Sequence, residues 1–194
     1  MNSRALTAWV LALGVTAGTA QASSISAFTS SDGTDCDATV VPNVPFFTYI
    51  GAVLGGDAAA GGISGAEFRV DGYDPAWFNA PTVNLASNLA LGNPILNGCN
   101  VAFPGCQTGT GGFVLLYTIQ TIAFAAVTPH TLHAAQHKTP SNTNFQCPLV
   151  TLCDSPTFTK LCVSGGEAFL NVPDRSCTVG VEQKSWTAIK RMFN

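Results

Sequence analysis

Residues 64–71 read SGAEFRVD, and within them apolar and polar side chains alternate with a period of two. Ala66, Phe68 and Val70 fall on one side of an extended chain, and the charged residues between them fall on the other. This alternation predicts a β-strand with one face in a core and one face in water.

Segments on both sides of this strand are rich in branched and aromatic residues, which favour strands over helices. The predicted strands are residues 46–54, 64–71, 113–127 and 131–138, with residues 158–163 and 167–172 as a hairpin around residues 164–166. The 19 glycines and 11 prolines supply the turns between them. Short strands separated by such turns predict an all-β protein, an antiparallel β-sandwich.

The N-terminus has the pattern of a cleavable secretion signal. Arg4 precedes a short apolar run at residues 6–15, and residues 20–22 read AQA, so residues 1–22 are predicted to be a signal peptide. The apolar run is too short for a membrane span, which needs about 20 residues. We therefore expect a secreted protein, extracellular, periplasmic or on the cell surface, with no stable membrane span after cleavage.

The rest of the chain divides into a predicted β-sandwich domain, residues 23–180, and a predicted amphipathic helix, residues 181–194. Trp186, Ile189 and Phe193 fall at positions i, i+3 and i+7 and form one apolar stripe. An isolated helix of this length is marginal in water, so we expect it to pack on the sandwich or on a partner. Only 10% of the residues are charged and the net charge is −3, which argues against nucleic acid as a partner.

Seven cysteines follow the signal, at Cys36, Cys99, Cys106, Cys147, Cys153, Cys162 and Cys177. They have no C-x-x-C spacing, so zinc ribbons and thioredoxin-like redox chemistry are disfavoured and disulfides are expected. Because seven is odd, one thiol is free or pairs between chains.

The sequence leaves the connectivity of these cysteines open. Proximity favours Cys99 with Cys106, and a bridge from Cys162 to Cys177 would close the next hairpin region. Cys147 with Cys153 requires a turn between them, because an intervening strand would hold them about 20 Å apart. Cys36 either ties the N-terminal arm to the C-terminal half or is the unpaired cysteine.

Candidate catalytic groups are sparse. Residues 62–66 (GISGA) only approach a nucleophile elbow, so Ser64 is expected to begin a strand. Glu67 and Glu167 both alternate with apolar residues and are expected to face solvent, not each other across a cleft. The sequence therefore predicts a protein that is not an enzyme and has no catalytic residue and no cofactor.

Two clusters resemble metal ligands only in part. On a strand, His133 and His137 share a face and His130 points away, so the three histidines are expected to be surface or loop residues. The acidic residues of the N-terminal arm, Asp32, Asp35 and Asp37, lack the spacing of an EF-hand loop. No metal site is predicted.

Tyr73 and Trp77, with Asp74 and Phe78, lie directly after the strand at residues 64–71. Aromatic side chains on the rim of a sandwich either plug its end or stack on sugar rings. Tyr73 and Trp77 are therefore the candidate ligand-contacting aromatics, with the plug as the favoured interpretation.

Residues 56–77 (GDAAAGGISGAEFRVDGYDPAW) resemble the opening of cohesin-like secreted β-sandwich modules, in which such a strand precedes a turn like Asp74-Pro75. Residues 147–172 and 181–193 are similar to the C-terminal parts of secreted proteins of environmental bacteria. The resemblance implies an Ig-like or cohesin-like sandwich, and it implies no functional residue.

Together these features predict a secreted, disulfide-stabilised, non-catalytic structural or adhesive protein of the cell envelope or extracellular matrix. Its partner would be a protein or glycan surface. The alternatives are a carbohydrate-binding module and, less favoured, a secreted hydrolase.

Overall fold

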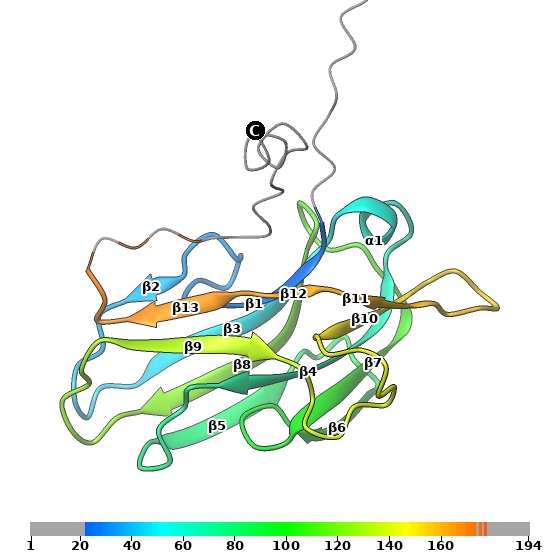
Figure 1. Ribbon diagram of the computed structural model, residues 1–194. Coiled ribbons are helices and arrows are strands. Elements are labelled where there is room, and N and C mark those ends of the chain that lie inside the picture. The colour runs from blue at the N-terminus through cyan, green and yellow to red at the C-terminus, as the bar shows by residue number, and fades with distance from the viewer. Residues whose placement is uncertain (1–21, 174, 176, 178–194) are drawn as a thin grey trace, which may run out of the picture.

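A computed structural model describes residues 22–173 together with Arg175 and Cys177. Within them two β-sheets face each other across one apolar core (Figure 1). The helix expected at residues 181–194 lies outside the described residues, as does nearly all of the expected signal peptide. Both, and the boundaries at residues 22 and 180, remain predictions. In the described part of the chain, no helix has the length and apolar character to cross a membrane.

The first sheet has five strands. Their order is β12 (Ser164–Gly165), β1 (Ser24–Phe28), β3 (Phe46–Val53), β8 (Phe113–Ile122) and β5 (Phe78–Val83). Of its pairings only β1 with β12 is parallel among the described strands. The expected strands at residues 46–54 and 113–127 are thus the centre of this sheet, although the second one ends five residues early.

The second sheet has eight strands. Its path is β11 (Lys160–Cys162), β10 (Leu149–Leu152), β4 (Ile63–Asp71), β9 (His130–Ala135), β13 (Glu167–Leu170) and β2 (Asp37–Ala38), with β7 (Gly98–Gln107) on β4 and β6 (Leu89–Asn93) on β7. Only β2 and β13 run parallel among these described strands. The antiparallel β-sandwich predicted from the sequence is confirmed.

Strand β4 is the organising strand of the second sheet. It pairs with β7 along Ile63–Phe68, with β10 along its first half and with β9 at Arg69–Asp71. Ala66, Phe68 and Val70 are buried in the core, as their alternation predicts. The residues between them therefore point to the outer face of the sheet, where the candidate site lies.

The chain passes from one sheet to the other at Gly165-Gly166, where a hairpin was expected. Strand β12 pairs with β1, whereas β13 pairs with β9 in the opposite sheet. Gly166 donates its N–H to the Ile25 carbonyl in one sheet and accepts from the Ala134 N–H in the other. A Cβ at Gly165 would lie 1.9 Å from the Ala134 carbonyl oxygen, so only glycine fits this crossing.

A short helix lies between strands β3 and β4. The pair Gly55-Gly56 is a turn signal in the sequence, but the structure has a helix from this point, α1 (Gly56–Gly61). Its Ala58 is buried in the core, and this tertiary contact overrides the local glycine signal.

Three disulfides join six of the seven cysteines, all of which lie within the described residues. They are Cys36–Cys177, Cys106–Cys153 and Cys147–Cys162, with Cα–Cα distances of 5.3, 5.9 and 5.7 Å. Cys99 is free and buried.

The pairings Cys99–Cys106 and Cys162–Cys177, which the sequence suggested, are therefore wrong. Cys99 points into the core from β7, so it cannot reach Cys106 farther along the same strand. Cys147 and Cys153 flank the extended strand β10, which is the case in which the distance argument excludes a bridge between them. Cys36 does tie the N-terminal arm to the C-terminal half, across 141 positions.

Candidate functional site

A groove of about 310 Å³ crosses the outer face of the eight-stranded sheet. Its floor is Gly65 of β4 and Ala102 of β7, which are cross-strand partners. Leu89 of β6 borders it on one side, and Phe158 and Lys160 border it on the other. The groove is hollow because two of the smallest residues stand side by side between long side chains.

The strand register fixes this row across five strands. Leu89 pairs with Ala102, Ala102 with Gly65, Gly65 with Thr151, and Thr151 with Lys160. A Cβ at Gly65 would lie 2.7 Å from the Val101 carbonyl oxygen, so a side chain cannot fill the floor without moving backbone.

Glu67 closes one end of the groove, and its burial corrects the expectation that it faces solvent. Its side chain does lie on the outer face, but the residue is only 5% exposed. The segment that carries Ser141 folds over it, and the Ser141 N–H donates to Glu67 Oε1 at 2.8 Å. Ser141 lies 74 positions from Glu67 in the sequence, so the alternation within β4 does not indicate that Glu67 is covered.

Ser141 also connects the groove to its cationic border. Lys160 Nζ donates to Ser141 Oγ at 2.6 Å. One serine thus holds a buried carboxylate through its N–H and an exposed ammonium group through its hydroxyl. Burying a carboxylate is costly unless it is hydrogen-bonded, so this contact explains how Glu67 is accommodated.

Phe158 stands on the β10–β11 loop, which Asp154 holds in shape. The Thr159 N–H donates to Asp154 Oδ1 at 2.7 Å, and the Thr159 hydroxyl donates to Oδ2. These hydrogen bonds from Thr159 hold the pKa of Asp154 below its ordinary value of 3.8. Phe158 itself adopts a positive φ of 49° and is 49% exposed.

We expect the Thr159 amide resonance to titrate with a midpoint below pH 3.8. A depressed folded-state pKa stabilises the loop above the unfolded-state pKa, and this stabilisation is lost as the pH falls through the folded-state pKa. NMR titration of the amide checks this, and Asp154→Asn should abolish the shift change. A midpoint at or above the ordinary aspartate value would contradict the role given to Asp154.

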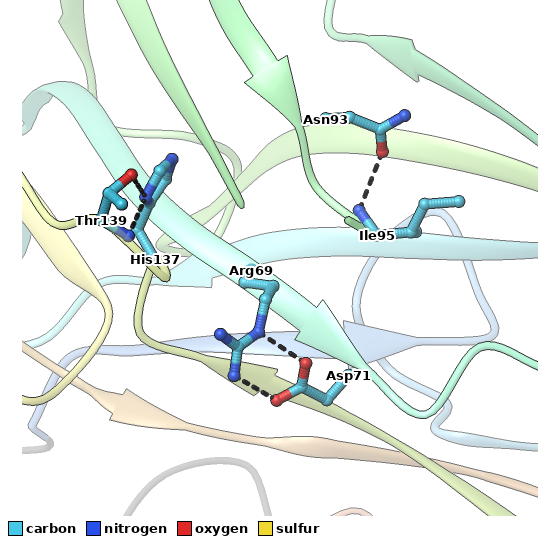
Figure 2. Close-up of polar contacts among 6 residues, drawn as sticks. All are labelled: Arg69, Asp71, Asn93, Ile95, His137 and Thr139. Atoms are coloured by element: carbon cyan, nitrogen blue, oxygen red, sulfur yellow. Dashed lines mark hydrogen bonds and ion pairs between the residues drawn. The ribbon is translucent and has the colours of Figure 1, made fainter. Parts of the chain in front are cut away.

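The other half of the same outer face is charged and polar. The Arg69 guanidinium donates to both carboxylate oxygens of Asp71 at 2.5 Å (Figure 2). Beside this pair, His133 lies 3.7 Å from Glu167. Glu167 thus does face outward as expected, and a solvated sheet surface accounts for this region.

The three histidines lie in separate environments. His137 Nδ1 accepts a hydrogen bond from the Thr139 N–H at 3.0 Å (Figure 2). His130 Nε2 is hydrogen-bonded to the Gly72 carbonyl oxygen. His133 faces Glu167. Among the described residues, no group of three or more histidine, cysteine or acidic side chains is arranged to hold a metal ion.

The acidic N-terminal arm forms a hydrogen-bonded turn. Asp32 Oδ1 accepts from the Thr34 hydroxyl at 2.7 Å and from the Thr34 N–H at 3.2 Å. The hydrogen bond from the Thr34 hydroxyl is the main cause that lowers the pKa of Asp32. Asp37 instead begins β2 and takes no part in this turn.

Tyr73 and Trp77 pack at one end of the sandwich. The Trp77 ring meets the rings of Phe46, Tyr73 and His130 edge-on, with centroids 6.0, 6.4 and 5.1 Å away. The Tyr73 hydroxyl hydrogen-bonds Thr48, and burial raises the pKa of Tyr73. Because their rings are engaged in the molecule, this arrangement favours the plug over a sugar-stacking platform.

The serine considered as a nucleophile is hydrogen-bonded to the backbone, and the free thiol is buried in the core. Ser64 Oγ lies 3.4 Å from the carbonyl oxygens of Thr151 and Leu152. Cys99 lies beneath the sheet beside Tyr117, and burial raises the pKa of its thiol. Since the thiolate is the reactive form, Cys99 is an inert core residue at neutral pH. Burial likewise raises the pKa of Tyr117 to about 12.

No protein-family model matches this sequence, and no curated protein matches it. Solved cohesin modules do match the structure. A cohesin module from a family 33 glycoside hydrolase of Clostridium perfringens ATCC13124 aligns with a TM-score of 0.51 at 15% identity, over 79% of this chain and 96% of its own.

Two further matches are a non-cellulosomal cohesin from the hyperthermophilic archaeon Archaeoglobus fulgidus and a type III cohesin module from the ScaE scaffoldin of Ruminococcus flavefaciens. The first has a TM-score of 0.46 and 11% identity, over 79% of this chain and 94% of its own. The second has a TM-score of 0.42 and 16% identity, over 89% and 99%. The Clostridium match confirms a cohesin-like β-sandwich as the fold. The three disulfides fit an oxidising environment.

Proposed function

We propose that the protein is a secreted, non-catalytic binding module that attaches to another protein through the groove on its eight-stranded sheet. The observation that carries this proposal is the groove itself, a hollow over Gly65 and Ala102 that the exposed side chains of Leu89, Phe158 and Lys160 border. Secretion is supported by the signal pattern of residues 1–22 together with the three disulfides.

The groove suits an apolar side chain flanked by an acidic group. Leu89 and Phe158 are 50% and 49% exposed and stand on opposite borders. Lys160 supplies a positive charge beside them, whereas the carboxylate of Glu67 is buried and hydrogen-bonded. A partner segment that places an apolar side chain over Ala102 would bring its neighbour near Lys160, where a carboxylate is favoured.

The likeness to a solved cohesin module supports a binding role for the sandwich. The non-catalytic part of the proposal is supported by the hydrogen bonds of Ser64, the separation of the histidines and the burial of Cys99. Envelope or matrix attachment would follow from such a binding role.

Displayed peptide libraries panned on the full chain test the groove. We expect selected peptides to contain an apolar residue near an acidic one. Leu89→Asp and Phe158→Ala should each weaken their binding about tenfold or more, because central apolar contacts are worth about 1.4 kcal/mol or more. Isothermal titration calorimetry provides the dissociation constants.

Leu85→Asp is the matched control, because Leu85 is 96% exposed and lies outside the groove. It should leave the affinity unchanged, while Lys160→Gln should weaken binding of acidic peptides only. Peptides whose affinity is the same for the groove variants and the control would contradict the proposed site.

A further inference from the structure

The outer face of the five-stranded sheet carries no charge in its described strands. The sequences SISAF, FFTYIGAV, FVLLYTIQTI, FNAPTV and SG contain no acidic or basic residue. The eight-stranded sheet, in contrast, carries Arg69, Asp71 and Glu167 on its outer face. A sheet face that is free of charge is typical of a covered surface.

Aromatic and branched side chains gather on the part of this face formed by β3, β8 and β5. Thr48 and Ile50 point into the core, so Phe47 and Tyr49 point outward, and their rings stack with centroids 6.5 Å apart. Two strands away, Phe78 pairs with Ile122. Phe47 and Phe78 are 44% and 53% exposed.

The remaining part of the face, over β1, is already covered by the chain. The ring of Phe113 packs edge-on against Phe28 at 5.3 Å, and Gly33 of the β1–β2 loop lies against the same ring. Phe28 is consequently only 1% exposed although it points outward from β1. One half of this face is therefore covered by the chain. The other half, formed by β3, β8 and β5, is the bare surface.

The C-terminal segment leaves the sandwich beside this covered half. Cys177 is bonded to Cys36, at the end of the loop that carries Gly33. Its Sγ lies 3.5 Å from the Thr34 carbonyl oxygen in that loop. The disulfide thus holds residue 177, from which the following residues start, beside the covered half of this face.

The following residues have the length and the pattern to cover the bare surface. Trp186 is nine positions beyond Cys177, a reach of up to about 30 Å for an extended chain. The step from β1 to β5 across the sheet is only about 14 Å, at about 4.8 Å per strand. Trp186, Ile189 and Phe193 form one apolar stripe at helical spacing, which needs an apolar surface to be stable.

We propose that residues 181–194 form an amphipathic helix that lies across β3, β8 and β5 of the same molecule. Its apolar stripe covers Phe47, Tyr49 and Phe78. This inference goes beyond the binding function, because it gives the second sheet face an internal partner and leaves the groove face for another protein.

Hydrogen–deuterium exchange on the full chain tests this docking. We expect the amides of residues 181–194 to be protected in the wild type. The double variant Phe47→Gln/Phe78→Gln should lower their protection roughly tenfold to a hundredfold, because two half-exposed rings together equal about one fully buried phenylalanine. Protection of the β-strands should stay unchanged.

Leu91→Gln/Leu96→Gln is the matched control, since these residues are 57% and 59% exposed, lie on β6 and on the turn that follows it, and do not line the groove. It should leave the protection of residues 181–194 unchanged. Unprotected amides in the wild type would overturn the proposal, as would protection that both double variants leave intact. Protection that rises with protein concentration would also overturn it, and would assign the face to a second copy. None of these results depends on the groove, whose own test is peptide binding.

Discussion

Replacing Cys36 and Cys177 together by alanine is expected to lower the free energy of unfolding by about 5 kcal/mol. The bridge spans 141 positions, the longest of the three separations. In the chain-entropy account, the stabilisation grows with the logarithm of the loop that the bridge closes in the unfolded chain, and a loop of this size corresponds to about 5 kcal/mol. Urea unfolding in buffer without a reductant or an added oxidant measures this loss of free energy of unfolding.

The other two disulfides are the internal controls for this result. Cys147–Cys162 spans 15 positions and should be worth about 3 kcal/mol, with Cys106–Cys153, at 47 positions, between the two. A loss for the Cys36–Cys177 variant no larger than the loss for the Cys147–Cys162 variant would contradict the loop-length explanation. It would indicate that the reduced chain retains structure near the N-terminal arm.

Phe68→Ala should lower the free energy of unfolding by about 3–5 kcal/mol, which is the usual effect of emptying a buried aromatic site. Phe68 is 0% exposed and stands at the centre of β4, where its ring meets the ring of Tyr117 from the opposite sheet at 6.1 Å. The substitution therefore removes a contact that joins both layers beneath the candidate groove.

Phe124→Ala is the matched control, because Phe124 is 61% exposed. It should cost less than about 1 kcal/mol, within the range of most surface substitutions. Equal losses for the two phenylalanine variants in urea unfolding would show that Phe68 is not a central core residue.

The sequence predicted the features that depend on neighbours along the chain. The alternation of Ala66, Phe68 and Val70 with charged residues predicted β4 and its buried side correctly, because the period of two is visible in consecutive residues. The apolar runs of β3 and β8 were found for the same reason. These strands were enough to predict the sandwich.

Features that depend on distant segments were missed. Glu67 is covered by Ser141, and Gly165-Gly166 joins two sheets where a hairpin was expected. The disulfide partners are set by which strands lie side by side, so proximity along the chain misled the pairing of Cys99. The groove follows from the register of five strands, which the alternation within one strand does not determine.

The Cys36–Cys177 bridge has a mechanical consequence. If the chain is pulled at a point before Ser24 and at a point after Cys177, tension passes from residue 36 to residue 177 through the sulfur atoms. Residues 37–176 then lie outside the load path, and the pulling force acts on β1 and the loop that follows it. Strand β1 would peel from β3 and β12 first, while the groove on the opposite sheet would keep its shape under load.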